Sequence, residues 1–346
     1  MSGERHPSCV RAFAPATVAN VGCGFDILGF AVVAPGDEVV ARCCATPGVT
    51  IACISGDGGQ LPREASANTA GAAALALLAH LGNPTGVELE LHKRMPLGSG
   101  LGSSAASAVA AVVAVNALLG APLARADLLP FALAGERVSC GPGVVHADNV
   151  APALLGGFVL VRGYAPLDVV PLPAPDGLYC ALALPDLEVR TLDARSILPR
   201  SIALRDAVTQ WGNVAGLVAG LLLADHALIA RSLQDVVVEP VRATLIPGFD
   251  EVKQAALAAG ALGGGISGAC PTMFALSDSE ETAARAGVAM RAAFLAEGVD
   301  CAIYVSGVNR EGAHVVGSPH PPAPSPCEER GSQAVPVVGH YGEDAG

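Results

Sequence analysis

The chain has 346 residues and a formal net charge of −12, with 51% hydrophobic and 15% charged residues. This length suits two domains, and the apolar content excludes a disordered protein. The acidic balance, without a cluster of Lys and Arg, argues against nucleic-acid binding.

The first half of the chain predicts strands and buried helices. In the clearest strand, Val87, Leu89 and Leu91 alternate with polar residues, so one face is apolar. Helices are expected where Ala and Leu dominate, and Gly120 with Pro122 ends the second of them. The predicted strands are 10–13, 37–43, 87–92 and 158–162, and the predicted helices are 68–81 and 103–119.

The second half predicts helices and short strands before a proline-rich end. The predicted helices are 205–233, in more than one piece, 250–259 and 280–297, and the predicted strands are 178–184, 271–276, 301–306 and 313–316. The helices are placed too irregularly for a parallel Rossmann sheet, so an α+β architecture in two domains fits better. Proline-rich residues 166–175 predict a boundary between domains 9–166 and 167–318, and residues 319–346 are expected to be a disordered tail.

Cysteine spacing and apolar stretches indicate the compartment. The ten cysteines include no CxxC pair, so zinc and thioredoxin patterns are excluded and reduced, buried thiols are expected. Residues 1–7 are polar and lack the apolar segment of a signal peptide. The apolar stretch 96–124 is rich in glycine and serine, and 212–224 is shorter than the roughly 20 residues that span a bilayer. We therefore expect a cytoplasmic protein without a membrane partner.

The most informative segment is a glycine-rich loop between the strand 87–92 and the helix 103–119. Its glycines let the backbone approach an anion, and the N–H groups at the helix start point at phosphates. An ordinary helix cap is the alternative, but three alternating glycines and two serines exceed what capping requires. The loop and the first helical residues are Pro96, Leu97, Gly98, Ser99, Gly100, Leu101, Gly102, Ser103, Ser104, Ala105 and Ala106.

Two common nucleotide-binding motifs do not fit this loop. A Walker A loop requires a lysine, which the segment lacks, and the Rossmann fingerprint requires glycine where Ser103 stands. A formal GxGxxG occurs at 263–268, but it follows a predicted helix and precedes a strand, which is the wrong order.

The loop resembles the phosphate loop Pro-x-Gly-x-Gly-Leu-Gly-Ser-Ser of the GHMP kinase superfamily. Two further blocks match in the right order, Ala-Pro-Ala-Thr-Val-Ala-Asn-Val-Gly-Cys-Gly-Phe-Asp-Ile-Leu-Gly at 14–29 and Gly-Gly-Gly-Ile-Ser-Gly-Ala-Cys-Pro-Thr at 263–272. Blocks that are similar to homoserine kinases in particular lie at 146–153, 191–199 and 239–248. The matches together span about residues 10–317.

This resemblance implies a two-domain GHMP kinase fold of the α+β class. The N-terminal domain is expected to be like domain 2 of ribosomal protein S5, the C-terminal domain to be ferredoxin-like, and the active site to lie between them. The implied reaction is Mg²⁺- and ATP-dependent phosphorylation of the side-chain hydroxyl of L-homoserine, giving O-phospho-L-homoserine and ADP in threonine biosynthesis. The implied partners are ATP, L-homoserine and a second copy of the chain in a homodimer.

L-Homoserine carries a carboxylate, an ammonium and a hydroxyl group, and the matched blocks supply a residue for each. Arg195 and Arg242 are expected to bind the carboxylate through their guanidinium forks. Asp26 is expected to bind the ammonium, since a carboxylate among apolar residues needs a partner. Surface arginines and a turn cap are the alternative roles. The remaining expected substrate residues are Asn20, His146, Asn149, Gly265 and Ser267.

The resemblance also assigns a metal pair and a contact for adenine. Ser104 and Glu136 are the expected Mg²⁺ ligands, because Mg²⁺ takes hard oxygen ligands and few of them from protein. A solvated helical Glu136 beside Arg137 is the alternative. Asn68 is expected at the adenine end of ATP.

The catalytic base is left open by the sequence. Asp148 is the obvious nominee, whereas Asn149 is expected to meet the substrate hydroxyl. Phosphoryl transfer passes through a loose transition state in which positioning and charge stabilisation dominate. Our hypothesis is that no strong base acts, and that Asn149, the loop and Mg²⁺ orient the hydroxyl. Asn149, Asp148 and Glu136 are thus the candidate catalytic residues.

Two other functions remain compatible with the phosphate loop. A related kinase would act on mevalonate or another small alcohol, but only a zwitterionic substrate needs both paired arginines and Asp26. A nucleotide-binding regulator without turnover would bind ATP and release no ADP in response to a substrate.

Overall fold

In the computed structural model, residues 7–317 are described except 84, 141–144, 188, 190 and 270, and the side chains of 140, 191 and 192 are likewise left out. The predicted tail, 319–346, lies outside the described residues.

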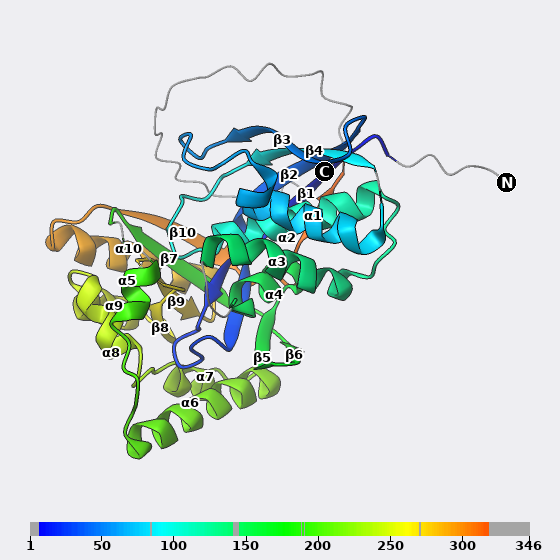
Figure 1. Ribbon diagram of the computed structural model, residues 1–346. Coiled ribbons are helices and arrows are strands. Elements are labelled where there is room, and N and C mark those ends of the chain that lie inside the picture. Colours follow the sequence, from blue (N-terminus) through cyan, green and yellow to red (C-terminus); the bar gives the residue numbers. More distant parts are fainter. Residues whose placement is uncertain are drawn as a thin grey trace, which may run out of the picture.

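A seven-stranded sheet forms the first half of the molecule (Figure 1). Its main path runs β11-β1-β2-β4-β3, and β5 pairs with β2 and β6. The long strand β2 connects these two parts, since Leu28–Phe30 pair with β5 and Glu38–Cys44 pair with β4. The strands are β1 (Cys9–Ala19), β2 (Leu28–Cys44), β3 (Gly48–Ser55), β4 (Gly86–His92), β5 (Phe158–Tyr164), β6 (Leu167–Leu172) and β11 (His314–Val316).

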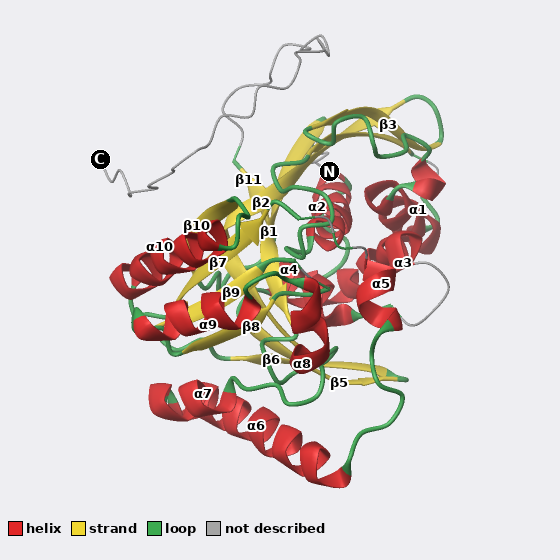
Figure 2. Ribbon diagram, turned by 90° about the vertical axis from the view of Figure 1, so that its left-hand side faces the viewer, coloured by secondary structure: helices red, strands yellow, loops and turns green. Residues whose placement is uncertain are grey.

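Four helices lie beside the first sheet (Figure 2), and α2 contacts β1, β2 and the other three helices. Apart from Ser104 and Ala117, every residue of α2 is buried, and its small Ala and Val side chains allow sheet and helices to approach closely. A helix that is apolar on all sides is stable only when it is surrounded. The helices are α1 (Thr69–Leu81), α2 (Ser103–Leu118), α3 (Leu129–Cys140) and α4 (Ala147–Leu155).

A second, four-stranded antiparallel sheet has the order β10-β7-β9-β8. With α10 between β9 and β10, this is the strand order of a ferredoxin-like domain, which confirms the expected α+β class. Its own apolar core includes Phe249, Met290 and Phe294. The elements are β7 (Tyr179–Pro185), α9 (Phe249–Ala258), β8 (Gly263–Ile266), β9 (Met273–Ser277), α10 (Glu280–Ala296) and β10 (Cys301–Gly307).

Besides α9, the described chain between β7 and β8 forms the helices α5, α6, α7 and α8. The predicted helical region 205–233 is confirmed as two pieces, α6 (Leu204–Leu223) and α7 (His226–Ser232). The short helices α5 (Thr191–Ser196) and α8 (Glu239–Arg242) carry the two arginines expected to bind substrate. None of the helices in the described ranges is long and apolar enough to cross a membrane.

Long-range pairing departs from the sequence predictions at the junction of the two sheets. The strand β6 lies in the proline-rich stretch expected to separate the domains, yet it pairs with β5 of the first sheet. The strand β11 also returns to this sheet and pairs with β1. The boundary at 166/167 stays a prediction, although these two strands extend the first sheet beyond it. Both α3 and α4 were absent from the predicted helices, since α3 carries internal glycine and α4 contains Pro152.

Candidate active site

The glycine-rich loop lies between β4 and α2 and is fixed by its carbonyl groups. Gly98, Gly100 and Gly102 have φ angles of 67°, 79° and 70°, the left-handed region that glycine tolerates best. Thr272 Oγ1 donates to the Ser99 carbonyl at 2.5 Å. Because its carbonyls are held by protein groups and its turns are left-handed, the loop is suited to present N–H groups to an anion.

Two further bonds tie the same loop to distant parts of the chain. Ser267 Oγ donates to the Gly100 carbonyl at 2.8 Å, and the N–H of Thr17 donates to the Leu101 carbonyl at 3.0 Å. Ser267 therefore braces the loop from the second domain, and its contact with substrate stays a prediction. Residues of β1 and of the turn between β8 and β9 therefore meet at this loop.

A buried ion pair between Asp37 and Lys93 lies beneath the loop, and sequence reasoning missed it. Lys93 Nζ donates to the Asp37 carboxylate, to the Ser103 carbonyl at 2.8 Å and to Ser107 Oγ at 2.6 Å. Asp37 also accepts from the N–H of Arg94 at 2.8 Å. Burial lowers the pKa of Lys93, and the carboxylate of Asp37 opposes that shift. One signal was available, since the chain has only two lysines and one of them lies three residues before the loop.

The two serines at the start of α2 have different partners. Ser103 Oγ donates to Asp37 at 3.0 Å, and so faces the buried ion pair. Ser104 Oγ donates to Glu136 Oε1 of α3 at 2.8 Å. Of the two hydroxyls, that of Ser104 is therefore the candidate for Mg²⁺. One hydroxyl and one carboxylate at the end of a phosphate loop fit Mg²⁺, an ion that takes few protein ligands. Among the described residues there is no cluster of three or more His, Cys, Asp or Glu side chains that could hold a metal ion.

The expected ammonium site lies in the loop between β1 and β2. Asn20 and Asp26 both have positive φ angles, 72° and 61°, which shape this loop. Asn20 Oδ1 accepts from the N–H of Asp26 at 3.0 Å, and Asn20 Nδ2 donates to the Gly268 carbonyl at 2.8 Å. Asn20 thus joins the loop that carries Asp26 to the turn of the second domain that braces the phosphate loop.

Arg195 and Arg242 converge on this loop from α5 and α8. Arg195 donates two hydrogen bonds to the Asp26 carboxylate, at 2.8 and 3.2 Å. Arg242 is buried and donates to the carbonyls of Ala194, at 3.3 Å, and Gly268, at 2.8 Å. Both guanidinium groups lie over the ring of Phe25, 5.7 and 5.0 Å from its centre.

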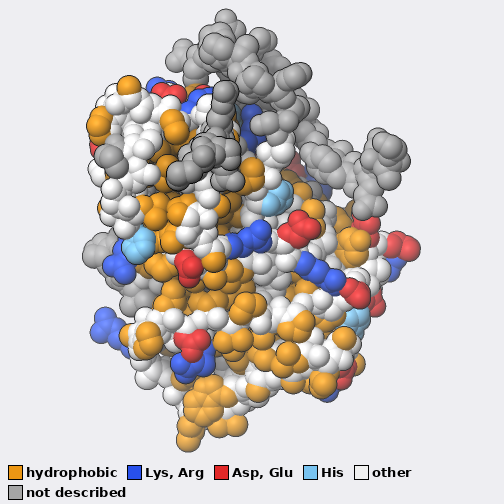
Figure 3. Space-filling view, turned by 90° about the vertical axis from the view of Figure 1, so that its right-hand side faces the viewer, with side chains coloured by type: hydrophobic (Ala, Val, Ile, Leu, Met, Phe, Trp, Pro, Cys, Tyr) orange, Lys and Arg blue, Asp and Glu red, His pale blue; other side chains and the backbone are white. Residues whose placement is uncertain are grey.

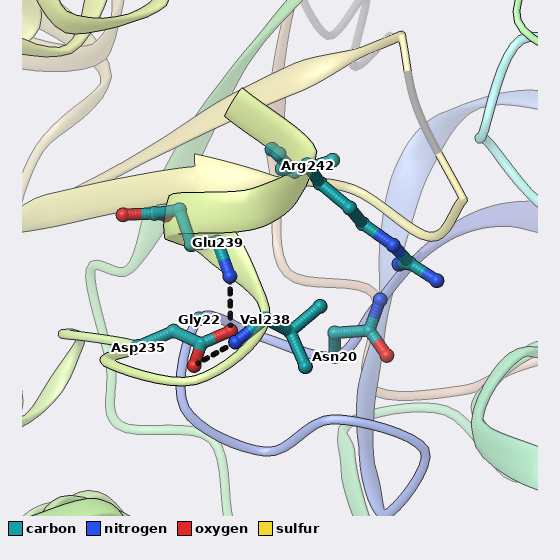
Figure 4. A pocket seen from close by; sticks show the side chains of 7 residues that line it. Asn20, Gly22, Asp235, Val238, Glu239 and Arg242 are labelled. Atoms are coloured by element: carbon teal, nitrogen blue, oxygen red, sulfur yellow. Dashed lines mark hydrogen bonds between the residues drawn. The ribbon is translucent and has the colours of Figure 1, made fainter. Parts of the chain in front are cut away.

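The side chains of Arg242 and Asn20 point toward one another in a small pocket between the two domains (Figure 4). The pocket is also lined by Gly22, Asp235, Val238, Glu239 and Ile266.

His146 and Tyr164 also contact Asp26. His146 Nδ1 lies 3.3 Å from Asp26 Oδ1, and burial lowers the pKa of this histidine. The hydroxyl of Tyr164 donates to the Asp26 carbonyl at 2.7 Å and accepts from the N–H of Ala147 at 3.2 Å. Tyr164, which sequence reasoning missed, therefore links the Asp26 loop to the first turn of α4.

Asp148 and Asn149 lie in that first turn of α4 and face different surroundings. The pKa of Asp148 is raised to about 7, mainly by burial and then by the charge of Asp26, while Arg195 opposes the shift. Asn149 Oδ1 accepts from Thr17 Oγ1 at 2.7 Å. A Cβ atom on Gly102 would lie 2.9 Å from Asn149 Oδ1, so Asn149 borders the phosphate loop. The structure thus places α4 between the loop and the Asp26 carboxylate.

Two expected site residues have clear structural roles. Asn68 is the N-cap of α1, where Oδ1 accepts from the N–H groups of Ala70 and Gly71 and Nδ2 donates to the Pro62 carbonyl. Gly265 lies in β8, where a Cβ atom would approach Glu239 Oε2 to 2.3 Å. The contacts of Asn68 with adenine and of Gly265 with substrate stay predictions.

Comparison with known proteins yields matches over nearly the whole described chain. Residues 68–157 match the family model of the GHMP kinase N-terminal domain, and residues 217–296 match that of the GHMP kinase C-terminal domain. The chain is 54% identical to a homoserine kinase of Chlorobium phaeovibrioides, over 89% of this chain and 99% of the relative. A crystal structure of homoserine kinase from Cytophaga hutchinsonii matches with a TM-score of 0.88 and 57% identity, covering 91% of this chain and all of that one. The L. major mevalonate kinase, at 16% identity and a TM-score of 0.66 over 88% of this chain and 98% of its own, shares the fold.

Proposed function

The chain belongs to the homoserine kinases of the GHMP kinase family, and we propose the following reaction and residue roles on that premise. It transfers the γ-phosphoryl group of ATP to the side-chain hydroxyl of L-homoserine and releases O-phospho-L-homoserine and ADP. The product belongs to threonine biosynthesis.

The observation that carries this assignment is the grouping of opposite charges beside the phosphate loop. Asp26 supplies a carboxylate for the substrate ammonium, and Arg195 and Arg242 supply guanidinium forks for the substrate carboxylate. Mevalonate carries no ammonium group and would leave Asp26 without a substrate partner. A zwitterion therefore matches this site better than a simple acid alcohol.

The hydroxyl of bound homoserine is held by groups at the start of α4. Asn149 borders the phosphate loop and is oriented by its hydrogen bond from Thr17. Its side chain positions the hydroxyl toward the γ-phosphate, and the loop N–H groups and the α2 N-terminus stabilise the charge on the transferring group. Positioning of this kind contributes much of the rate enhancement when the transition state is loose.

We keep the hypothesis that no strong base removes the hydroxyl proton. Asp148 has a pKa of about 7, so near neutral pH it is only partly ionised. It is also influenced by Asp26, which favours its protonated form. In this reading Asp148 shapes the site, and the proton leaves late in the transfer.

Ser104 and Glu136 would hold Mg²⁺ together with the phosphates of ATP. When bound, the ion neutralises phosphate charge and aligns the γ-phosphoryl group. The role of the protein is to present one hydroxyl and one carboxylate at the first turn of α2, where they contact each other at 2.8 Å.

A homodimer is also part of this proposal, and the outer face of α6 supports it. Leu204, Val208, Trp211 and Leu222 lie on one side of the helix and are 56–72% exposed. After Asp206 the helix has no charged residue. Figure 3 shows hydrophobic side chains gathered at the lower end of the molecule, where α6 lies in Figure 1. An exposed apolar stripe of this length suits a self-complementary contact between two copies.

Sedimentation analysis tests this contact. The wild-type chain is expected to sediment as a dimer and Trp211→Glu as a monomer, while Val288→Glu, at an exposed position of α10, remains dimeric. A monomeric wild type, or a dimeric Trp211→Glu, contradicts the proposed interface.

A cytoplasmic location completes the proposal. Cys23, Cys180 and Cys301 are buried thiols without disulfides, and burial raises the pKa of each. Such thiols suit a reducing compartment.

The reaction is tested by coupled ADP release with Mg²⁺-ATP and a panel of L-homoserine, L-serine, L-threonine and mevalonate. Turnover selective for L-homoserine is expected. Turnover with mevalonate alone would keep the kinase and overturn the substrate, and ADP release from none of the four would favour a binding protein without turnover.

A further inference from the structure

The side chain of Gln210, in α6, lies between the two segments that carry the substrate-binding charges. Its Nε2 donates to the Cys23 carbonyl at 2.7 Å and to Asp235 Oδ1 at 3.0 Å. Its Oε1 accepts from the N–H of Val236 at 3.0 Å. These partners fix the orientation of the amide, because a flipped side chain would place its oxygen against a carbonyl and a carboxylate.

The hydrogen bond to the Cys23 carbonyl connects Gln210 to the loop that carries Asp26, the residue expected to bind the substrate ammonium. Cys23 belongs to the loop between β1 and β2, three residues before Asp26. Phe25, in the same loop, lies under the guanidinium groups of Arg195 and Arg242. A bond to the Cys23 carbonyl therefore restrains the part of the loop that sets the position of the Asp26 carboxylate.

The hydrogen bond to Asp235 connects Gln210 to α8, which carries Arg242, a residue expected to bind the substrate carboxylate. Asp235 Oδ1 accepts from the N–H groups of Val237, at 2.8 Å, and Val238, at 3.0 Å, and Oδ2 accepts from the N–H of Glu239 at 2.9 Å. Figure 4 shows two of these bonds at the start of α8, the helix that carries Arg242. The Asp235 carboxylate thus accepts hydrogen bonds from the start of α8, and Gln210 in turn donates a hydrogen bond to this carboxylate.

We propose that Gln210 is a positioning residue that sets the separation between Asp26 and Arg242, and so favours substrates that carry both an ammonium and a carboxylate group. This inference rests on the proposed function. Gln210 acts through Cys23 and Asp235, not as a catalytic residue. Without the Gln210 amide, the Cys23 carbonyl, the Asp235 carboxylate and the N–H of Val236 each lose one hydrogen-bond partner. The β1–β2 loop and α8 can then shift independently.

The experiment compares steady-state kinetics of the full-length wild type, Gln210→Leu, Gln210→Glu and a matched control, Asn213→Leu. Asn213 lies on the same helix and donates to the neighbouring Gln234 carbonyl at 2.8 Å. The substrates are L-homoserine, 4-hydroxybutanoate, which lacks the ammonium, and homoserinol, which lacks the carboxylate.

For Gln210→Leu we expect kcat/KM for L-homoserine to fall about 10- to 100-fold, since small displacements of positioning groups cost this much. The KM for ATP is expected to stay within about twofold of the wild-type value. The kcat/KM for the two analogues should fall much less than that for L-homoserine, so that the preference for the zwitterion decreases about tenfold. Asn213→Leu is expected to behave as wild type. Equal losses on all three substrates and ATP, or equal behaviour of Gln210→Leu and Asn213→Leu, would overturn the inference.

Gln210→Glu keeps the size of the side chain and serves if Gln210→Leu does not fold. Its ionised carboxylate would face the Cys23 carbonyl and Asp235, whereas its protonated form can still donate one hydrogen bond. Its kcat/KM for L-homoserine, relative to wild type, should therefore decrease as pH rises, and a pH-independent ratio would contradict the role. A wild type that does not phosphorylate L-homoserine refutes the proposed function itself, which is a separate outcome.

Discussion

Arg195 and Asp26 form a bidentate ion pair, with Nη2–Oδ1 and Nη1–Oδ2 distances of 2.8 and 3.2 Å. They come from α5 and from the loop between β1 and β2, so the pair joins the two domains. The side chains expected to bind the two opposite charges of the substrate therefore lie within contact of each other. A zwitterion that binds both can replace one charge-assisted contact with two.

Replacing Asp26 by Asn should remove the ammonium partner and leave the shape of the site. We expect kcat/KM for L-homoserine to fall about 100-fold, in line with loss of a charged hydrogen bond, while the KM for ATP changes less than about twofold. Steady-state kinetics measure both. Asp168→Asn is the control, since Asp168 also pairs with an arginine, Arg162, but on an exposed strand. An Asp26→Asn enzyme as efficient as wild type would exclude Asp26 from substrate binding.

Replacing Glu136 by Gln should weaken the response to Mg²⁺. The Mg²⁺ concentration for half-maximal activity is expected to rise at least about tenfold, because a carboxylate ligand is exchanged for a neutral amide. Activity is measured after EDTA treatment and back-titration with MgCl₂. Glu64→Gln is the control, since Glu64 also accepts a hydrogen bond from a serine, Ser66, at 3.1 Å in an exposed position. Identical Mg²⁺ curves for Glu136→Gln and wild type would show that Glu136 is not a ligand.

Asp148→Asn should stabilise the protein above neutral pH. Because the pKa of Asp148 is about 7 in the folded chain and about 3.9 in an unfolded one, the folded state binds its proton more tightly. Stability from this group is present below about pH 4 and is lost as pH rises through 7. The free energy of unfolding of Asp148→Asn should therefore exceed that of wild type by on the order of 4 kcal/mol at pH 8, and by little at pH 4.

Urea unfolding at several pH values measures this difference. Asp176→Asn, at a carboxylate that is 96% exposed, should give no such pH-dependent gain. A constant difference across the range would indicate that Asp148 is not a strained, buried carboxylate.

The same variant tests the hypothesis of transfer without a strong base. We expect Asp148→Asn to lower kcat less than about tenfold and to keep the shape of the kcat–pH profile, because general base catalysis contributes ~10²–10⁴-fold when it operates. Asn149→Ala is expected to lower kcat more than Asp148→Asn does. If Asp148→Asn loses ~10²–10⁴-fold in rate together with the acidic limb of the profile, Asp148 is the base.

Gly102→Ala should damage the site more than Gly98→Ala. Both glycines have φ near +70°, so alanine at either position costs roughly 1–2 kcal/mol of backbone strain. Only at Gly102 would the new Cβ lie 2.2 Å from Thr17 Oγ1 and 2.9 Å from Asn149 Oδ1, whereas Gly98 faces open space. Kinetic measurement should show a kcat at least about tenfold lower for Gly102→Ala than for Gly98→Ala. Equal values would mean that the Thr17–Asn149 contact does not position the hydroxyl.

The sequence by itself determined the features that depend on neighbouring residues. Alternating Gly98, Gly100 and Gly102 permit a loop with positive φ angles, and the structure has one. The uncharged Ala- and Val-rich run after Ser103 requires a buried helix, and α2 is buried. The resemblance supplied Asp26, Arg195 and Arg242, and the structure brings all three to one place.

Only the tertiary structure decided which distant side chains meet. Thr17 and Asn149 are 132 positions apart and Lys93 and Asp37 are 56 apart, and their contacts follow from strand register and helix packing. The strand β6 pairs with β5 of the first sheet although it contains Pro171 and lies in a proline-rich stretch. Local propensity fixes a loop or a helix, but the contacts that orient a site are selected by the free energy of the whole packed chain.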